Sequence, residues 1–199
     1  MSKVVLLISV AMLGATLAIS AQAEPSGMES TRAVSFGLGG GVSVPVSDAK
    51  DAFNNGFSGQ GFVRFNLKGL QFAPRLDFTF SRFDVSSAQL ATPGASGTSQ
   101  IFAGLANLQM MFNAGPLRPY IIAGVGAYNL KTDVTGVPNT SSTSNTRFGV
   151  NGGGGVLFKF GRVVSAYVEG RIDNVYTDTG GFINTSQIQV VPVTFGVVF

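Results

Sequence analysis

Residues 70–83 read LQFAPRLDFTFSRF, and apolar and polar side chains alternate through most of this stretch. One face would carry Phe72, Leu76, Phe78 and Phe80, and the opposite face Arg75, Asp77, Thr79 and Ser81. A period of two predicts a β-strand with one apolar and one polar face. Seven other segments share the pattern, and the eight predicted strands are Ala33–Val44, Phe57–Lys68, Leu70–Phe83, Gln100–Phe112, Leu117–Lys131, Arg147–Phe160, Val163–Tyr176 and Gln187–Phe199.

The composition places these strands in a membrane. Charged residues make up 12% of the chain, against about 25% in a typical soluble domain. Hydrophobic residues make up 45%, yet beyond residue 23 no apolar run approaches the ~18 residues that a membrane-spanning helix needs. A closed β-barrel also satisfies every backbone polar group inside lipid. We therefore predict an all-β fold, a transmembrane eight-stranded antiparallel up-and-down β-barrel, over residues 33–199.

The amino terminus predicts export. Lys3 precedes the apolar run Val4–Ile19, and Ala21 and Ala23 flank Gln22 in the small-x-small pattern that signal peptidase cleaves after. We expect residues 1–23 to be a secretory signal peptide and residues 24–32 to be a short periplasmic lead-in.

The connections between predicted strands alternate in length. Short turns are expected at Lys68-Gly69, Asn113–Pro116 and Gly161-Arg162, and long loops at Pro45–Gly56, Asp84–Ser99, Thr132–Thr146 and Thr177–Ser186. Short periplasmic turns and long extracellular loops are typical of outer-membrane barrels. We therefore expect all four long loops outside the cell and both termini in the periplasm.

Aromatic residues on the apolar face cluster near both ends of the predicted strands. One group lies toward the long loops and the other toward the short turns: Phe57, Phe80, Phe102, Phe148 and Tyr176, then Phe65, Phe72, Phe112, Phe160 and Phe199. Their spacing fits the aromatic girdles that flank an apolar band ~25 Å tall.

A soluble lipocalin-like barrel would place its apolar face inside, but its outside would need many charges. The polar face here carries mainly Gly, Ser, Ala and Asn. The faces of Leu117–Lys131 stay unassigned.

The residue inventory argues against catalysis. The chain has no His and no Cys, which removes the usual general bases, thiol nucleophiles and soft metal ligands. Gly152–Gly155 lacks the Lys-Ser/Thr of a phosphate loop, and we expect it to let a strand bend or pack closely. The 13 basic residues are scattered. We therefore expect no enzyme, no cofactor, no metal site and no nucleic-acid partner.

Charged residues on the inward face suggest a plug. Arg75 and Asp77 would lie opposite Glu169 and Arg171, because their strands are four apart in a ring of eight. An eight-stranded barrel leaves an interior barely wide enough for side chains, and buried charges must be paired. We expect these residues to form a salt-bridged lumen network with Arg64, Asp173, Asn107 and Gln109. The alternative is a small water-filled gap without direct pairing.

Two motifs carry a family resemblance. The stretch Pro119–Gly126 reads PYIIAGVG, and the last predicted strand finishes in a phenylalanine, Phe199. With the signal peptide, they resemble the superfamily of small eight-stranded outer-membrane barrels that includes the OmpA-type transmembrane domain, OmpX, opacity proteins and OmpW. The resemblance implies a last strand with Phe195, Val197 and Phe199 toward lipid, read by the outer-membrane assembly machinery. It also leads us to expect that the chain ends where the barrel closes, without a peptidoglycan-binding domain.

These features predict a monomeric, non-enzymatic protein of the bacterial outer membrane. Its partners would be outer-membrane lipid, lipopolysaccharide and an extracellular ligand held by the loops, because function concentrates on loops carried by rigid scaffolds. A narrow OmpW-like channel for small or apolar solutes is the first alternative. A periplasmic lipocalin-like binding barrel is the second.

Overall fold

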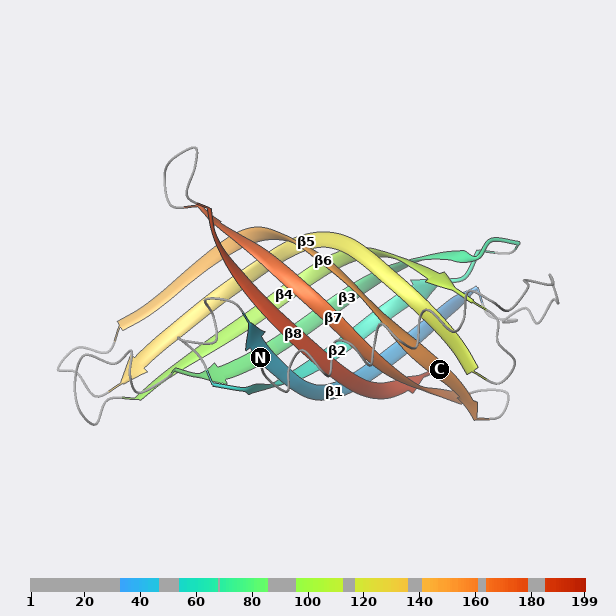
Figure 1. The fold of residues 1–199 in the computed structure, drawn as a ribbon, viewed down its shortest axis with the longest axis horizontal. Helices are drawn as coiled ribbons and strands as arrows, with labels where there is room; N and C mark the ends of the chain where they lie inside the picture. Colours follow the sequence, from blue (N-terminus) through green and yellow to red (C-terminus); the bar gives the residue numbers. More distant parts are fainter. Residues whose placement is uncertain are drawn as a thin grey trace, which may run out of the picture.

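A computed structural model shows eight antiparallel strands closed into one barrel in sequence order, with β1 pairing β8 (Figure 1). The strands are β1 (Val34–Val46), β2 (Gly56–Phe65), β3 (Phe72–Asp84), β4 (Ser96–Met111), β5 (Leu117–Thr135), β6 (Ser141–Phe160), β7 (Val164–Asp178) and β8 (Thr185–Val198). The predicted fold class is confirmed. Closure also removes the exposed sheet edges that would otherwise invite pairing with another chain.

The structure describes residues 33–46, 54–67, 69–85, 96–112, 117–135, 141–160, 164–178 and 185–199. The predicted signal peptide with Ala21 and Ala23, and the predicted lead-in, lie outside these ranges. Within them, no helix is long and apolar enough to cross a membrane.

The two ends of the barrel are defined by their connections. The turn end carries residues 66–71, 112–116 and 161–163, and the loop end carries residues 47–55, 85–95, 136–140 and 179–184. The loop end is on the left in Figure 1, and the carboxyl terminus lies at the turn end.

The prediction of a long loop over Thr132–Thr146 is wrong. Strands β5 and β6 continue pairing up to Val134 and Ser141, so the connection is only residues 136–140, no longer than the turn at 112–116. Exposed side chains support this extension, because Asn129 Nδ2 donates to Thr146 Oγ1 at 3.0 Å. The Ser/Thr-rich composition of this stretch suggests a loop, but threonine also suits a strand, and here the strands continue.

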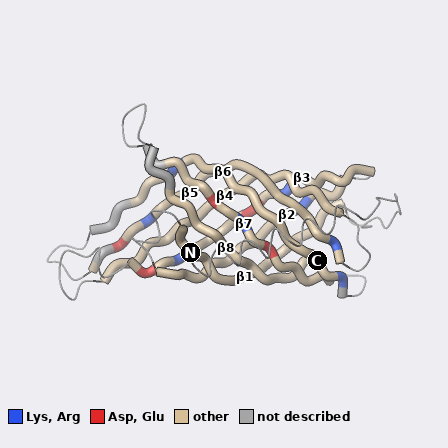
Figure 2. Tube along the Cα trace, in the orientation of Figure 1, with Lys and Arg blue, Asp and Glu red and all other residues tan. Residues whose placement is uncertain are grey.

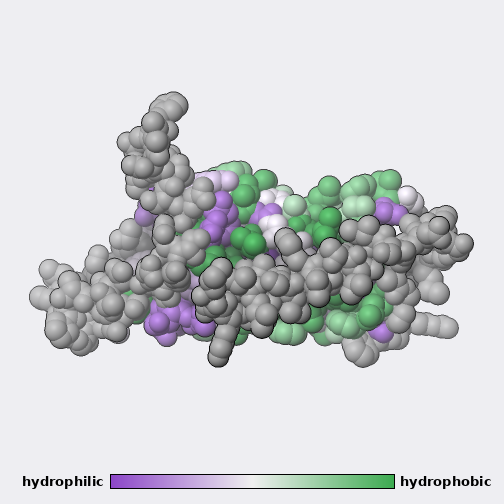
Figure 3. Space-filling view, in the orientation of Figure 1, coloured by the Kyte–Doolittle hydropathy of each residue, from purple (hydrophilic) through white to green (hydrophobic). Residues whose placement is uncertain are grey.

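The outer face of the barrel is apolar. Phe78, Leu38 and Phe195 are among its most exposed side chains. In Figure 3 the hydrophobic surface that is visible runs from the middle of the barrel toward the turn end, and the larger hydrophilic areas lie toward the loop end. Ring contacts join the aromatic group at the loop end: Phe57–Phe80 at 5.9 Å, Phe80–Phe102 at 4.8 Å and Phe148–Tyr176 at 6.5 Å between centroids. The faces are thus the reverse of those of a soluble binding barrel. The Phe160 side chain lies outside the described part.

Strand β5 resolves the faces that the sequence left unassigned. Tyr120, Ile122 and Tyr128 are buried inside the barrel, whereas Ile121 and Val125 are exposed on its outer face. Both faces of this strand are apolar, which is why alternation could not separate them.

Candidate functional site

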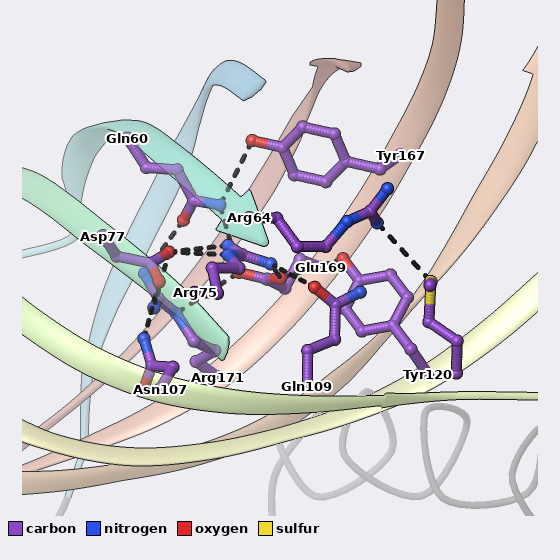
Figure 4. A network of polar contacts seen from close by, with 11 residues as sticks. Gln60, Arg64, Arg75, Asp77, Asn107, Gln109, Tyr120, Tyr167, Glu169 and Arg171 are labelled. Atoms are coloured by element: carbon purple, nitrogen blue, oxygen red, sulfur yellow. Dashed lines mark hydrogen bonds and ion pairs between the residues drawn. The ribbon is translucent and has the colours of Figure 1, made fainter. Parts of the chain in front are cut away.

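Four charged side chains meet inside the barrel. Arg75 and Asp77 project from β3, and Glu169 and Arg171 from β7, and all four are almost completely buried. Arg75 Nη1 lies 2.6 Å from Glu169 Oε2, and Arg75 Nη2 lies 2.6 Å from Asp77 Oδ1. Arg171 lies 3.4 Å from each carboxylate. The ion pairs therefore cross the lumen between opposite strands (Figure 4), and Figure 2 shows acidic residues midway along the barrel.

Neutral side chains satisfy the remaining atoms of this cluster. Asn107 Nδ2 donates to Asp77 Oδ2 at 2.6 Å, and the Tyr120 hydroxyl donates to Glu169 Oε2 at 2.8 Å. Gln60 donates to Glu169 Oε1 at 3.1 Å and accepts from Arg171 Nη2 at 2.9 Å. We call these residues, with the four charged ones, Gln109 and Tyr167, the central network. Its formal charge is zero, as a buried network requires.

Glycines on β6 make room for the central network. The Cα of Gly153 pairs with that of Arg171, and the Cα of Gly155 with that of Glu169. A Cβ on Gly153 would lie 2.8 Å from Arg171 Cγ, and one on Gly155 would collide with the Tyr120 ring. The run that the sequence analysis expected to permit close packing thus lets large polar side chains fill a narrow interior.

Apolar layers flank the central network inside the barrel, and the layer toward the turn end shares Tyr120 and Tyr167 with it. The turn-end layer contains Phe62, Tyr120, Leu157, Tyr167 and Val198, with Met111 packed against it. The loop-end layer contains Phe83, Ile101, Ala103, Leu105, Tyr128, Val175 and Val190. Along β7 the order is Tyr167, the charged pair, then Val175, so the layers stack along the barrel axis. The Arg75 guanidinium also lies 3.6 Å from the centre of the Phe62 ring, a cation–π contact.

Not every predicted lumen residue joins the ion pairs. Arg64 Nη1 lies 3.5 Å from Met111 Sδ, a weak acceptor, and its Nε has no hydrogen-bond partner. Asp173 is buried, and its Oδ1 also has no hydrogen-bond partner. Gln109 lies at the edge, with its Oε1 3.5 Å from Arg75 Nη1. Among the charged candidates in the described part of the lumen, only four therefore form ion pairs with one another: Arg75, Asp77, Glu169 and Arg171.

The aromatic residues of the interior were not predicted from the sequence. Phe62, Tyr120 and Tyr167 face inward, although aromatic side chains were expected mainly toward lipid. Their spacing could have indicated this, because residues two apart in a strand share a face. Tyr167 is two residues from Glu169, and Phe62 is two from both Gln60 and Arg64.

The last strand has the expected orientation at its end. Phe195, Val197 and Phe199 are exposed on the outer face, and Thr194 is buried inside. Phe199 exchanges two backbone hydrogen bonds with Phe36, at 2.8 and 3.2 Å. It therefore extends the seam between β1 and β8 by one pair.

The carboxylates of the central network are already engaged by neighbouring side chains. The central carboxylates are engaged by arginines and amide groups, and in the described ranges no three His, Cys, Asp or Glu side chains group as metal ligands. The arrangement fits a filled interior.

Comparisons with known proteins agree on the type of fold. A model of the outer membrane protein beta-barrel domain family matches residues 9–198. No curated protein matches the chain.

Solved structures of similar fold include those of three bacterial proteins. Neisserial surface protein A is 15% identical, with a TM-score of 0.57 over 84% of this chain and 96% of that chain. A major outer membrane protein from Thermus thermophilus is 13% identical, with a TM-score of 0.60 over 84% and 99%. Ail, the attachment invasion locus protein of Yersinia pestis, solved with the heparin analogue sucrose octasulfate, is 14% identical, with a TM-score of 0.53 over 83% and 97%. At these identities the likeness is one of fold.

Proposed function

The chain belongs to the outer membrane protein β-barrel domain family, and we propose that it is a closed, non-enzymatic barrel that displays its loop end at the cell surface. It is a protein of the bacterial outer membrane. In this proposal residues 1–23 are removed on export, the mature protein is a monomer, and the connections at the loop end face outward, where lipopolysaccharide and an extracellular ligand would meet them.

The filled interior carries this proposal. The central network lies between two apolar layers, and an eight-stranded barrel has little space beyond its own side chains. A rigid barrel of this kind serves as an anchor, so recognition falls to the connections it holds. Two barrels of similar fold are, by name, a surface protein and an attachment protein, which supports a role at the surface.

Planar-bilayer recording tests closure directly. We expect the purified wild-type protein to give no stepwise ion conductance above that of bare lipid, because the central network and both apolar layers obstruct the lumen. A parallel preparation from cells without the gene controls for contaminating porins. Reproducible conductance steps from the wild-type protein would instead support the narrow-channel alternative.

Deletion of Phe199 tests the proposed assembly segment formed by Phe195, Val197 and Phe199. The deletion removes the last backbone pair with Phe36 and an exposed ring. We expect a severalfold drop in folded protein in the outer-membrane fraction, measured by the heat-dependent mobility shift on gels. Phe72→Ala is the matched control, because Phe72 is also an exposed ring near the turn end. Equal recovery of the deletion and the control would contradict this proposal.

A further inference from the structure

Arg64 is a buried cation that no carboxylate within the described chain neutralises. Its residue is only 4% exposed, its Nε has no hydrogen-bond partner, and its side-chain contact is the weakly accepting Met111 sulfur. Its Cα pairs with that of Arg75 on the next strand. Arg75 contacts two carboxylates, whereas the Arg64 guanidinium points away from them in Figure 4.

Two further basic residues share this end of the lumen. Arg118 lies two residues before Tyr120 on the inner face of β5, and the Cα of Tyr120 pairs with that of Met111, which Arg64 reaches. Arg118 Nε is buried without a partner. Because Arg64 and Arg118 both face inward at the turn end, their like charges lie in the same part of the lumen. Lys159 is exposed at the turn end of β6, two residues after Leu157, whose Cα pairs with that of Arg118.

The side-chain carboxylates of the described residues lie away from this end of the barrel. Every ion pair among the described residues uses Asp77, Glu169 or Asp133, and none of these pairs includes Arg64, Arg118 or Lys159. A buried unpaired charge costs free energy, and a second guanidinium group at the same end of the lumen adds repulsion. An anion from the surroundings would remove both costs.

We propose that the turn end of the barrel binds a phosphate group between Arg64 and Arg118, with Lys159 at the entrance. The planar, forked guanidinium group matches phosphate oxygens with two parallel hydrogen bonds, and a phosphate can accept from two arginines at once. Inorganic phosphate and the phosphodiester of a phospholipid head group share this chemistry. The inference goes beyond the proposed surface role, since it concerns the opposite end of the barrel and holds whether or not the loop end binds a ligand.

Thermal unfolding of the full barrel in a phosphate-free detergent tests the site. One arm adds inorganic phosphate at matched ionic strength, and the other adds phosphatidylglycerol, with chloride and a phosphate-free glycolipid as respective controls. A ligand that binds only the folded state raises the unfolding temperature. A rise with inorganic phosphate identifies a free anion, and a rise with phosphatidylglycerol alone identifies a lipid head group. No rise in either arm overturns the proposal.

Two variants assign the effect to the site. In Arg64→Met we expect the ligand-dependent rise to be lost, while the unfolding temperature without ligand increases because an unpaired buried charge is gone. Arg118→Met, at a less buried position, should lose most of the rise as well and serves if Arg64→Met fails to fold. Arg82→Met removes an exposed arginine near the loop end and should keep the full rise. A rise retained by both turn-end variants, or lost equally by Arg82→Met, overturns the proposal.

Discussion

Replacing Glu169 with alanine is expected to lower the free energy of unfolding by about 3–5 kcal/mol. Glu169 pairs with Arg75 at 2.6 Å and with Arg171 at 3.4 Å, and it accepts hydrogen bonds from Gln60 and Tyr120. Its removal leaves two buried arginines to share the single carboxylate of Asp77. Such a loss exceeds that of an ordinary hydrogen bond because the uncompensated charge stays in a water-poor interior.

The measurement is equilibrium urea unfolding in detergent or lipid, followed by circular dichroism, since the chain contains no tryptophan. Asp133→Ala is the matched control, because it breaks the exposed ion pair with Lys131 at 3.7 Å, and such pairs contribute about 0–1 kcal/mol. Conductance of Glu169→Ala in planar bilayers is a second readout, expected to rise above that of the wild type. Unchanged stability together with unchanged conductance would refute a plug built on Glu169.

The sequence could predict which face of its strand each site residue occupies. A period of two fixes which side chains share a face, so Arg75, Asp77, Glu169 and Arg171 could be placed inward from the pattern alone. Their positions on opposite strands followed from the strand count. These two facts required no knowledge of the register between neighbouring strands.

The choice of partners could not be predicted in the same way. Arg64 and Arg75 have the same parity and are cross-strand neighbours, yet only Arg75 meets the carboxylates. That difference lies in the direction of the side chains, because Arg64 reaches Met111 on β4 whereas Arg75 reaches Asp77 and Glu169. Alternation does not specify this direction. The composition of turns likewise does not specify where strands end, since β5 and β6 continue pairing to Val134 and Ser141, inside the stretch expected to be a loop.

The glycines of β6 are a second feature whose roles the sequence pattern could not predict. In the sequence, nothing distinguishes the four glycines at 152–155 from one another. In the structure they alternate, since Gly153 and Gly155 face the crowded lumen and Gly152 faces outward, with the nearest atom to an added Cβ at 3.9 Å. Which of these glycines the fold requires therefore depends on the neighbouring strands.

Gly155→Val is expected to lower the free energy of unfolding by about 3 kcal/mol or more, or to prevent assembly. Its Cβ would collide with the backbone oxygen of Val168 and with the Tyr120 ring. The oxygen cannot move without disturbing the ladder between β6 and β7, so Tyr120 must withdraw from Glu169, to which it donates at 2.8 Å. One added side chain thus affects both the sheet and the central network.

Gly152→Val makes the same chemical change three residues away and is the control. Its side chain would project outward beside Ala123 and Ile172, the paired positions on β5 and β7, where a β-branched residue suits a strand. We expect its unfolding free energy to stay within about 0.5 kcal/mol of the wild type. Both variants are compared by the heat-dependent gel shift and by urea unfolding. If Gly155→Val folded as stably as Gly152→Val, the interior would have spare volume beside Tyr120, and the case for a filled lumen would fail at that point.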